Sequence, residues 1–361
     1  AHGKRKFRVQ YDESDFTFVS RLLEDAGISY YFAASDEGTK LVLADEPQAG
    51  ELAHADIPYA DEPSTTRDRF VTRVAVRSKL RPGKMTIGDL DYRLESTSQP
   101  RASFAAGLAQ EALLEQFDYE PGAFLYASSA DGGSPAADDR GAARTDSAAG
   151  TRKTTNRMYE RRNGARAVSF DSSVLELAPG AIMSVANHPH RVLGSTLLVT
   201  TADLEGTHDG EWVVMVDAVQ TTLPYRPDPI TPKPEVYGLE SATVVGPGGE
   251  ELHTDEWARV RVHFHWDRES QRNEGSSCWV PTNQPWAGKG FGTINVPRIG
   301  QEVLVAFLGG DPDRPVVVGR VYTESNPVPD QLPKYKQVSG IFSEATPRLM
   351  MGASGGFVGH T

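Results

Sequence analysis

The sequence predicts a mainly β protein with a few helices, in which a barrel-like domain is followed by a second, small Greek-key barrel. Two observations lead to this prediction. After Val168 the apolar residues come in short runs with turn residues between them, and helical periodicity is almost absent. Prolines then crowd the stretch from Pro224 to Pro234. Because proline fixes φ and donates no hydrogen bond, this stretch is a stiff connector between two domains.

Composition excludes several classes of function. Of the 361 residues, 37 are Lys or Arg and 49 are Asp or Glu, which gives a net charge of -12. Nucleic-acid binders carry a clustered basic excess, so a nucleic-acid partner is not expected. No apolar run approaches the ~18 residues that a membrane helix needs, and the first residues lack the apolar core of a signal peptide. The single cysteine, Cys278, excludes an internal disulfide framework.

The N-terminal segment predicts a helix followed by a hairpin. Apolar residues recur there at three- and four-residue spacings, which places them on one helical face. They are Phe16, Val19, Leu22, Leu23 and Ala26. Ser14 or Asp12 can cap the start of this helix, and Gly27 can end it in the left-handed conformation. Residues 28–32 and 41–43 flank a turn-like stretch, so they are expected to pair as a hairpin.

The middle of the chain changes character several times. Residues 70–76 alternate apolar and polar side chains and predict a strand. Residues 101–118 are rich in Ala, Leu, Gln and Glu and predict a helix. Residues 127–157 have almost no large apolar side chain, so we expect a flexible loop there. Further strands are expected at 182–185, 196–202 and 212–219.

The segment after the proline connector shows the clearest β pattern. Residues 258–266 alternate strictly between apolar and polar side chains, which predicts a half-buried strand with arginines and histidines on its outer face. More strands are expected at 278–282, 291–296, 303–308 and 316–322. Short strands separated by glycine-containing turns fit a Greek-key barrel of the OB type.

Patterns that would indicate catalysis are weak. Residues 352–356 match G-x-S-x-G, but too little chain follows for the helix that a nucleophile elbow requires. His263 with His265, and His188 with His190, form two H-x-H pairs that lack an identifiable third metal ligand. The sequence therefore predicts no catalytic residue, no metal site and no cofactor, and suggests that the chain specifies shape.

A series of blocks in the C-terminal half resembles the VgrG family, the spike proteins of type VI secretion systems. The blocks run from residue 251 to 268 (ELHTDEWARVRVHFHWDR) and continue with SSCW at 276–279, QPWAGKG at 284–290, VPRIGQEV at 296–303, GDPDRP at 310–315 and GRVY at 319–322. Earlier stretches agree, among them FRVQYDESDF at 7–16, RPGK at 81–84 and TPKP at 231–234. The order and number of these blocks make the resemblance specific.

The resemblance implies a fold and a domain plan. A phage-hub-like domain with a β-barrel is expected over residues 1–230, an OB-fold over 231–333, and a neck with the start of a β-helix over 334–361. Compared with the family, the chain is expected to lack the beginning of the hub and most of the β-helix.

The resemblance also implies a function in a contractile injection machine. Such proteins form a homotrimer that caps the tube of Hcp, carries a PAAR-type tip and effector proteins, and is driven through target membranes by mechanical puncture. It would assemble in the bacterial cytoplasm and then be secreted into the target cell. No catalytic residues are implied.

Several residues are candidates for structural roles. Large aromatic side chains supply the most burial per residue, so we expect them to anchor the core or a subunit contact. These are Trp257, Trp266, Trp279, Trp286 and Phe291. Asp311 and Arg314 flank Pro312 and are expected to fix the turn between the last two strands of the second barrel.

Two alternatives remain open at this point. One is a phage-type tail hub with an attached cell-wall-degrading activity, a glycosidase or a peptidase. Paired carboxylates exist at Asp89 with Asp91 and at Asp311 with Asp313, but no aromatic-lined sugar cleft is identifiable around them. The other is the hub of a related phage or extracellular contractile particle, which the sequence distinguishes poorly from a type VI spike.

Overall fold

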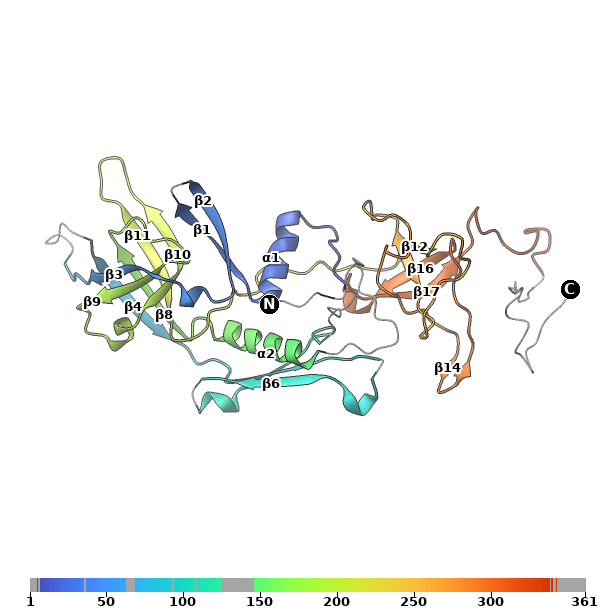
Figure 1. Ribbon diagram of the computed structural model, residues 1–361, viewed down its shortest axis with the longest axis horizontal. Helices are drawn as coiled ribbons and strands as arrows, with labels where there is room; N and C mark the ends of the chain where they lie inside the picture. The colour runs from blue at the N-terminus through green and yellow to red at the C-terminus, as the bar shows by residue number, and fades with distance from the viewer. Residues whose placement is uncertain are drawn as a thin grey trace. The chain divides into compact units, whose positions relative to one another are not determined.

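The computed structural model describes residues 5, 7–35, 37–62, 69–92, 94–107, 109–124, 146–337, 339 and 342. The chain divides into two compact units, Ala1–Glu235 and Val236–Thr361 (Figure 1). The described elements are mostly strands, with two α-helices and several short 3₁₀ turns, which confirms the predicted fold class. The 3₁₀ turns are Pro47–Ala49, Ser96–Ser98, Glu111–Leu113, Arg191–Gly194 and Leu308–Gly310. None of the helices in the described ranges has the length and apolarity needed to cross a bilayer.

The first unit is built around a curled six-stranded sheet. Its strands, in spatial order, are β3 (Leu52–Pro58), β9 (Ile182–Ala186), β10 (Leu197–Glu205), β11 (Val213–Gln220), β8 (Arg166–Ser172) and β4 (Val71–Ser78). Tyr59, just after β3, bridges to Val71 at the start of β4, so the two edge strands meet and the sheet curls towards a barrel. Its interior is filled by Val, Leu, Ile, Met and Phe side chains such as Phe170 and Leu197.

A smaller layer in the same unit replaces a helix that the sequence predicted. Residues 101–118 contain β6 (Arg101–Ala105) and β7 (Glu115–Tyr119), which flank β5 (Lys84–Gly88) in a three-stranded sheet. The helix prediction for this segment was wrong. Helix-favouring residues were overridden because alternate side chains, Ala102 and Phe104, pack onto a shared core.

Helix α2 (Ser147–Arg162) packs on this small sheet, where part of the flexible loop had been expected. The prediction was therefore wrong for residues 147–157, and residues 127–145 lie outside the described part of the chain. Asp146 caps the helix by accepting a hydrogen bond from the N–H of Ala149. A Cβ at Gly150 would overlap the ring of Phe124, so glycine permits this close packing.

The predicted N-terminal helix and hairpin are both confirmed. Helix α1 (Asp15–Ala26) has Ser14 as its N-cap and Gly27, at φ 72°, as its C-cap. Strands β1 (Ser29–Ser35) and β2 (Gly38–Ala44) pair antiparallel. Only Ser20 and Arg21 of α1 are buried, whereas Phe16 and Val19 are exposed. Helix α1 is therefore held mainly through polar side chains.

The second unit contains a four-stranded sheet in the order β13 (Arg261–Phe264), β12 (Glu240–Val245), β16 (Glu302–Phe307) and β17 (Pro315–Val321). The segment at 280–282 connects the two edges of this sheet, because Val280 bridges to Val260, just before β13, and Thr282 bridges to Val317 of β17. The result is a small closed barrel of the OB type. A two-residue hairpin, β14 (Ala287–Gly288) with β15 (Phe291–Gly292), lies outside this sheet and occupies only part of the strand expected at 291–296.

The strand predicted at 258–266 is shorter and more deeply buried than its pattern suggested. Arg259, Arg261 and His263 are buried, so the prediction of an exposed polar face was wrong for these three. Arg259 pairs with Asp255 at 2.5 Å, and the guanidinium of Arg261 donates to the carbonyl of Ser277. Buried charges need such partners, and alternation alone does not reveal them.

Candidate functional site

The residues that could support chemistry do not converge in the described ranges. No group of three or more His, Cys, Asp or Glu side chains there could hold a metal ion. The rings of His263 and His265 are edge-to-face at 6.4 Å, and His188 packs edge-on against Tyr59 at 4.4 Å. Cys278 is buried. The G-x-S-x-G stretch lies outside the described residues.

Asp89, one of the paired carboxylates, has a structural role. Its side chain accepts hydrogen bonds from the backbone N–H groups of Leu90, Gly122 and Phe124 at 2.7, 2.9 and 3.2 Å. Burial raises the pKa of this carboxyl, and the three hydrogen bonds oppose that rise. The side chain therefore holds the turn that places Phe124 over the small sheet.

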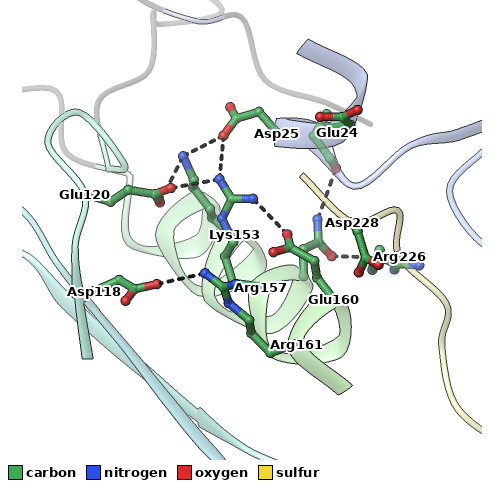
Figure 2. Close-up of polar contacts among 12 residues, drawn as sticks. Glu24, Asp25, Asp118, Glu120, Lys153, Arg157, Glu160, Arg161, Arg226 and Asp228 are labelled. Carbon is green, nitrogen blue, oxygen red and sulfur yellow. Dashed lines mark hydrogen bonds and ion pairs between the residues drawn. The ribbon is translucent and has the colours of Figure 1, made fainter. Parts of the chain in front are cut away.

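The main polar cluster lies where α1, β7 and α2 meet (Figure 2). Lys153 and Arg157, one turn apart on α2, each contact two carboxylates, those of Asp25 and Glu120. Lys153 lies 2.9 Å from Asp25 and 3.1 Å from Glu120, and Arg157 lies 3.1 and 2.8 Å from the same two groups. Arg157 also contacts Glu160 at 2.8 Å. These ion pairs join α1, the end of β7 and α2, which are distant in sequence.

The cations of this cluster lower the pKa of both carboxylates, Asp25 and Glu120. Burial alone would raise the pKa of Asp25, but Lys153, Arg5 and Arg157 outweigh it and hold the pKa well below its usual range. Burial likewise opposes ionisation of Glu120, and the two cations of α2 again lower the pKa overall. Both carboxylates are therefore ionised at neutral pH and act as fixed anions that bind α2.

A second group of contacts extends the cluster to the proline-rich connector. Glu24 accepts from the hydroxyl and the backbone N–H of Thr231 at 2.7 and 3.0 Å. Asn163 donates to Asp228 at 3.1 Å, and Arg226 donates to Asn156 at 3.0 Å. Figure 2 shows Glu24, Arg226 and Asp228 of this group beside α2. The connector is thus tied to both helices of the first unit.

Sequence reasoning missed this cluster because its central residues fall in the supposed flexible loop. Lys153 and Arg157 stand four residues apart, which is the spacing of neighbours on a helix face. That spacing was the available signal. Their partners, Asp25 and Glu120, come from segments whose proximity no local pattern encodes.

The aromatic residues predicted as anchors occupy different environments. Trp279 is buried beneath Arg261, whose guanidinium lies 4.5 Å from the ring centroid. Trp266 stacks on Phe264 at 4.9 Å. Trp257, Trp286 and Phe291 are exposed, and the last two pack edge-to-face at 5.6 Å. Their role in subunit contacts stays a prediction.

Asp311 and Arg314 lie in the turn between β16 and β17. The side chain of Asp311 accepts from the N–H of Asp313, and its carbonyl accepts from the N–H of Arg314, both at 2.9 Å. The carbonyl of Arg314 in turn accepts from the N–H of Leu308 at 3.0 Å. We continue to propose that these residues fix the turn.

Comparisons with known proteins agree with this architecture. Residues 1–210 match the family model of the phage tail baseplate hub (GPD), and residues 250–322 match that of the type VI secretion system/phage-baseplate injector OB domain. The type VI secretion system spike protein VgrG1b of Pseudomonas aeruginosa is 38% identical and covers 94% of this chain and 45% of that protein. VgrG1a of the same organism is 34% identical, with 94% and 52% covered. The chain spans about half the length of the curated relatives it matches.

A solved structure shows the same fold. The E. coli c3393 protein, described as a type VI secretion component similar to T4 tail proteins gp27 and gp5, superposes with a TM-score of 0.51 at 18% identity. The alignment covers 86% of this chain and 62% of that one. The first family model alone spans more than half of the sequence. The chain therefore belongs to the phage tail baseplate hub family, and the resemblance to VgrG spike proteins is confirmed.

Proposed function

We propose that the chain is a structural component of a type VI secretion spike. In this proposal it assembles as a homotrimer, caps the Hcp tube, carries a PAAR-type tip and effector proteins, and punctures the target membrane mechanically. The single observation that supports this most is the order of its parts, a baseplate-hub segment at 1–210 followed by an injector OB domain at 250–322. Assembly in the bacterial cytoplasm and delivery into a target cell are parts of the same proposal.

The physical character of the first unit supports a mechanical role. A spike must transmit force, which requires elements that do not slide past one another. Backbone pairing brings the edges of the main sheet together, and ion pairs bind α1 and the end of β7 to α2. Hydrogen bonds join the connector to α1 and to α2. Close-packed protein interiors have low compressibility and transmit strain. The proposed mechanical function depends on these contacts between elements and needs no reacting group.

Assembly is the first test of this proposal. Light scattering during size-exclusion chromatography should give three times the chain mass of 39.3 kDa. Purified Hcp tubes should then retain the trimer during sedimentation. A chain that remains monomeric at every concentration, or that never sediments with Hcp, would contradict the proposal. Turnover of purified cell wall that a single carboxylate substitution abolishes would favour the alternative of an attached lytic activity.

A further inference from the structure

One hairpin of the first unit extends beyond the sheet that supports it. Strands β10 and β11 pair as far as Glu205 and Val213, whereas β8 accompanies β11 only to Val214 and β9 accompanies β10 only to Leu198. Figure 1 shows the connecting loop projecting past the rest of the sheet. We call residues 203–213 the β10–β11 arm. A two-stranded ribbon of this kind gains little stability from its own fold, so its side chains are available for a partner.

The side chains of the β10–β11 arm combine apolar surface with negative charge. Leu204 is 54% exposed and Trp212 is 49% exposed, with the indole lying over Gly206. Asp203 and Glu205 are exposed on the opposite face of the ribbon, because successive residues of a strand point to opposite sides. They form no ion pair with another described residue, and the same holds for Glu211. A ribbon with an exposed tryptophan on one face and carboxylates on the other favours a partner element that offers an apolar side chain on one face and cations on the other.

A surface of that composition exists on the same chain, at the end of β4. Arg77 and Lys79 are exposed at this end and, within the described ranges, neither side chain forms an ion pair. Leu80 follows them and is 71% exposed. We call Arg77, Lys79 and Leu80 the β4 end. The chain has a net charge of -12, so the acidic arm is repelled by much of the molecule, whereas this local basic surface attracts it.

The two surfaces cannot meet within one molecule. Strand β8 pairs its last residue, Ser172, with Val214 next to the arm, and its first residue, Arg166, with Ser78 next to the β4 end. The arm and the β4 end therefore lie at opposite ends of one sheet, separated by the length of β8. At ~3.3 Å per residue, that length is about 20 Å.

We propose that the β10–β11 arm of one copy docks on the β4 end of the next copy. Leu204 and Trp212 then pack against Leu80, while the arm carboxylates face Arg77 and Lys79. Because the two surfaces differ, the contact is head-to-tail, and such a contact closes into a ring when its rotation divides a full turn. This inference rests on the proposed homotrimer and names the surfaces that build it.

Charge exchange on the full chain tests the contact. The arm variant carries Glu205→Lys with Glu211→Lys, and the β4 variant carries Arg77→Glu with Lys79→Glu. Each variant alone places like charges across the interface and should raise the dissociation constant of the trimer at least tenfold. The chain with all four substitutions restores opposite charges and should recover the trimer in analytical ultracentrifugation.

An equimolar mixture of the arm variant and the β4 variant gives a sharper test. In that mixture, opposite charges meet only between unlike copies. A ring of three cannot alternate two kinds of copy, so every mixed trimer keeps one contact between like charges, and the mixture should form open dimers of unlike copies and less trimer than the wild type. A trimer that forms in the mixture as readily as in the wild type would contradict the head-to-tail contact.

A control variant separates local from general charge effects. Glu250→Lys with Glu256→Lys changes the net charge as much as the arm variant does, at exposed positions of the second unit. It should leave the trimer unchanged, and equal loss of trimer in this control would overturn the docking proposal. Circular dichroism melts confirm that each variant is folded. If the wild type is a monomer, the proposed function is contradicted as well. If the wild type is a trimer and the arm and β4 variants have the same trimer dissociation constant, only the docking proposal is contradicted.

Discussion

At the scale of single residues, Arg157 is the side chain on which most of the polar cluster depends. It contacts Asp25, Glu120 and Glu160, and its side chain is only 14% exposed. Arg157→Met leaves these carboxylates with one fewer cation in a largely desolvated site. We expect the free energy of unfolding of the first unit to fall by about 2 kcal/mol, which urea titration monitored by circular dichroism measures.

Arg161, one turn further along α2, is the matched control. It faces Asp118 at 3.8 Å, and its side chain is 42% exposed. An exposed ion pair contributes little, so Arg161→Met should change the free energy of unfolding by less than about 0.5 kcal/mol. Equal losses in the two variants would mean that the effect comes from helix α2 in general and not from the buried cluster.

At the scale of elements, the docking of α1 on α2 should weaken in acid. The pKa of Asp25 is lower in the folded protein than in the unfolded chain, where a value of about 3.9 applies. The contribution of this carboxylate to stability is therefore complete above about pH 5 and is lost as the pH falls towards the folded-state pKa. Glu120 acts in the same direction, whereas the raised pKa of Glu160 works against it.

The corresponding measurement compares wild type with Asp25→Asn at pH 7 and at pH 3. The variant should be less stable by about 2 kcal/mol at pH 7, and the difference should shrink by roughly half at pH 3, because the carboxyl of the unfolded wild-type chain is then largely protonated whereas that of the folded protein stays ionised. Glu37→Gln, in the exposed turn between β1 and β2, supplies the control, because it removes a carboxylate outside the buried cluster. A difference for Asp25→Asn that is constant with pH would show that its charge is not what holds α1.

Whether the sequence could predict an element depends on whether the interactions that stabilise it are local in sequence or come from distant segments. Helix α1 and the hairpin after it were predictable because their caps, apolar face and turn are all local. Residues 101–118 were not, since the pairing of β6 and β7 with β5 decides their conformation against their helix propensity. Helix α2 was missed because it is polar and draws its stability from partners such as Asp25 and Glu120.

At the scale of the whole molecule, the chain folds as two compact units, and each packs its own core. Each unit has its own β core, and the stretch around Pro224–Pro234 between them contains no strand or helix. The OB-type barrel was predictable as a class, because its strands and turns follow one another closely in sequence. The buried arginines of that barrel were not, because their partners, Asp255 and Ser277, lie outside the strand itself.

Two separate cores should unfold in two separate transitions, and the tryptophans allow them to be distinguished. Four of the five, Trp257, Trp266, Trp279 and Trp286, lie in the second unit, so fluorescence reports mainly on that unit while circular dichroism reports on both. Val262 is fully buried in the second barrel, and Val262→Ala should lower the stability of the fluorescence transition alone by about 2 kcal/mol. Val168→Ala, at an equally buried position of the first barrel, should leave that transition unchanged and shift the other. Coincident fluorescence and circular dichroism transitions that respond alike to both substitutions would show instead that the two units unfold as one cooperative body.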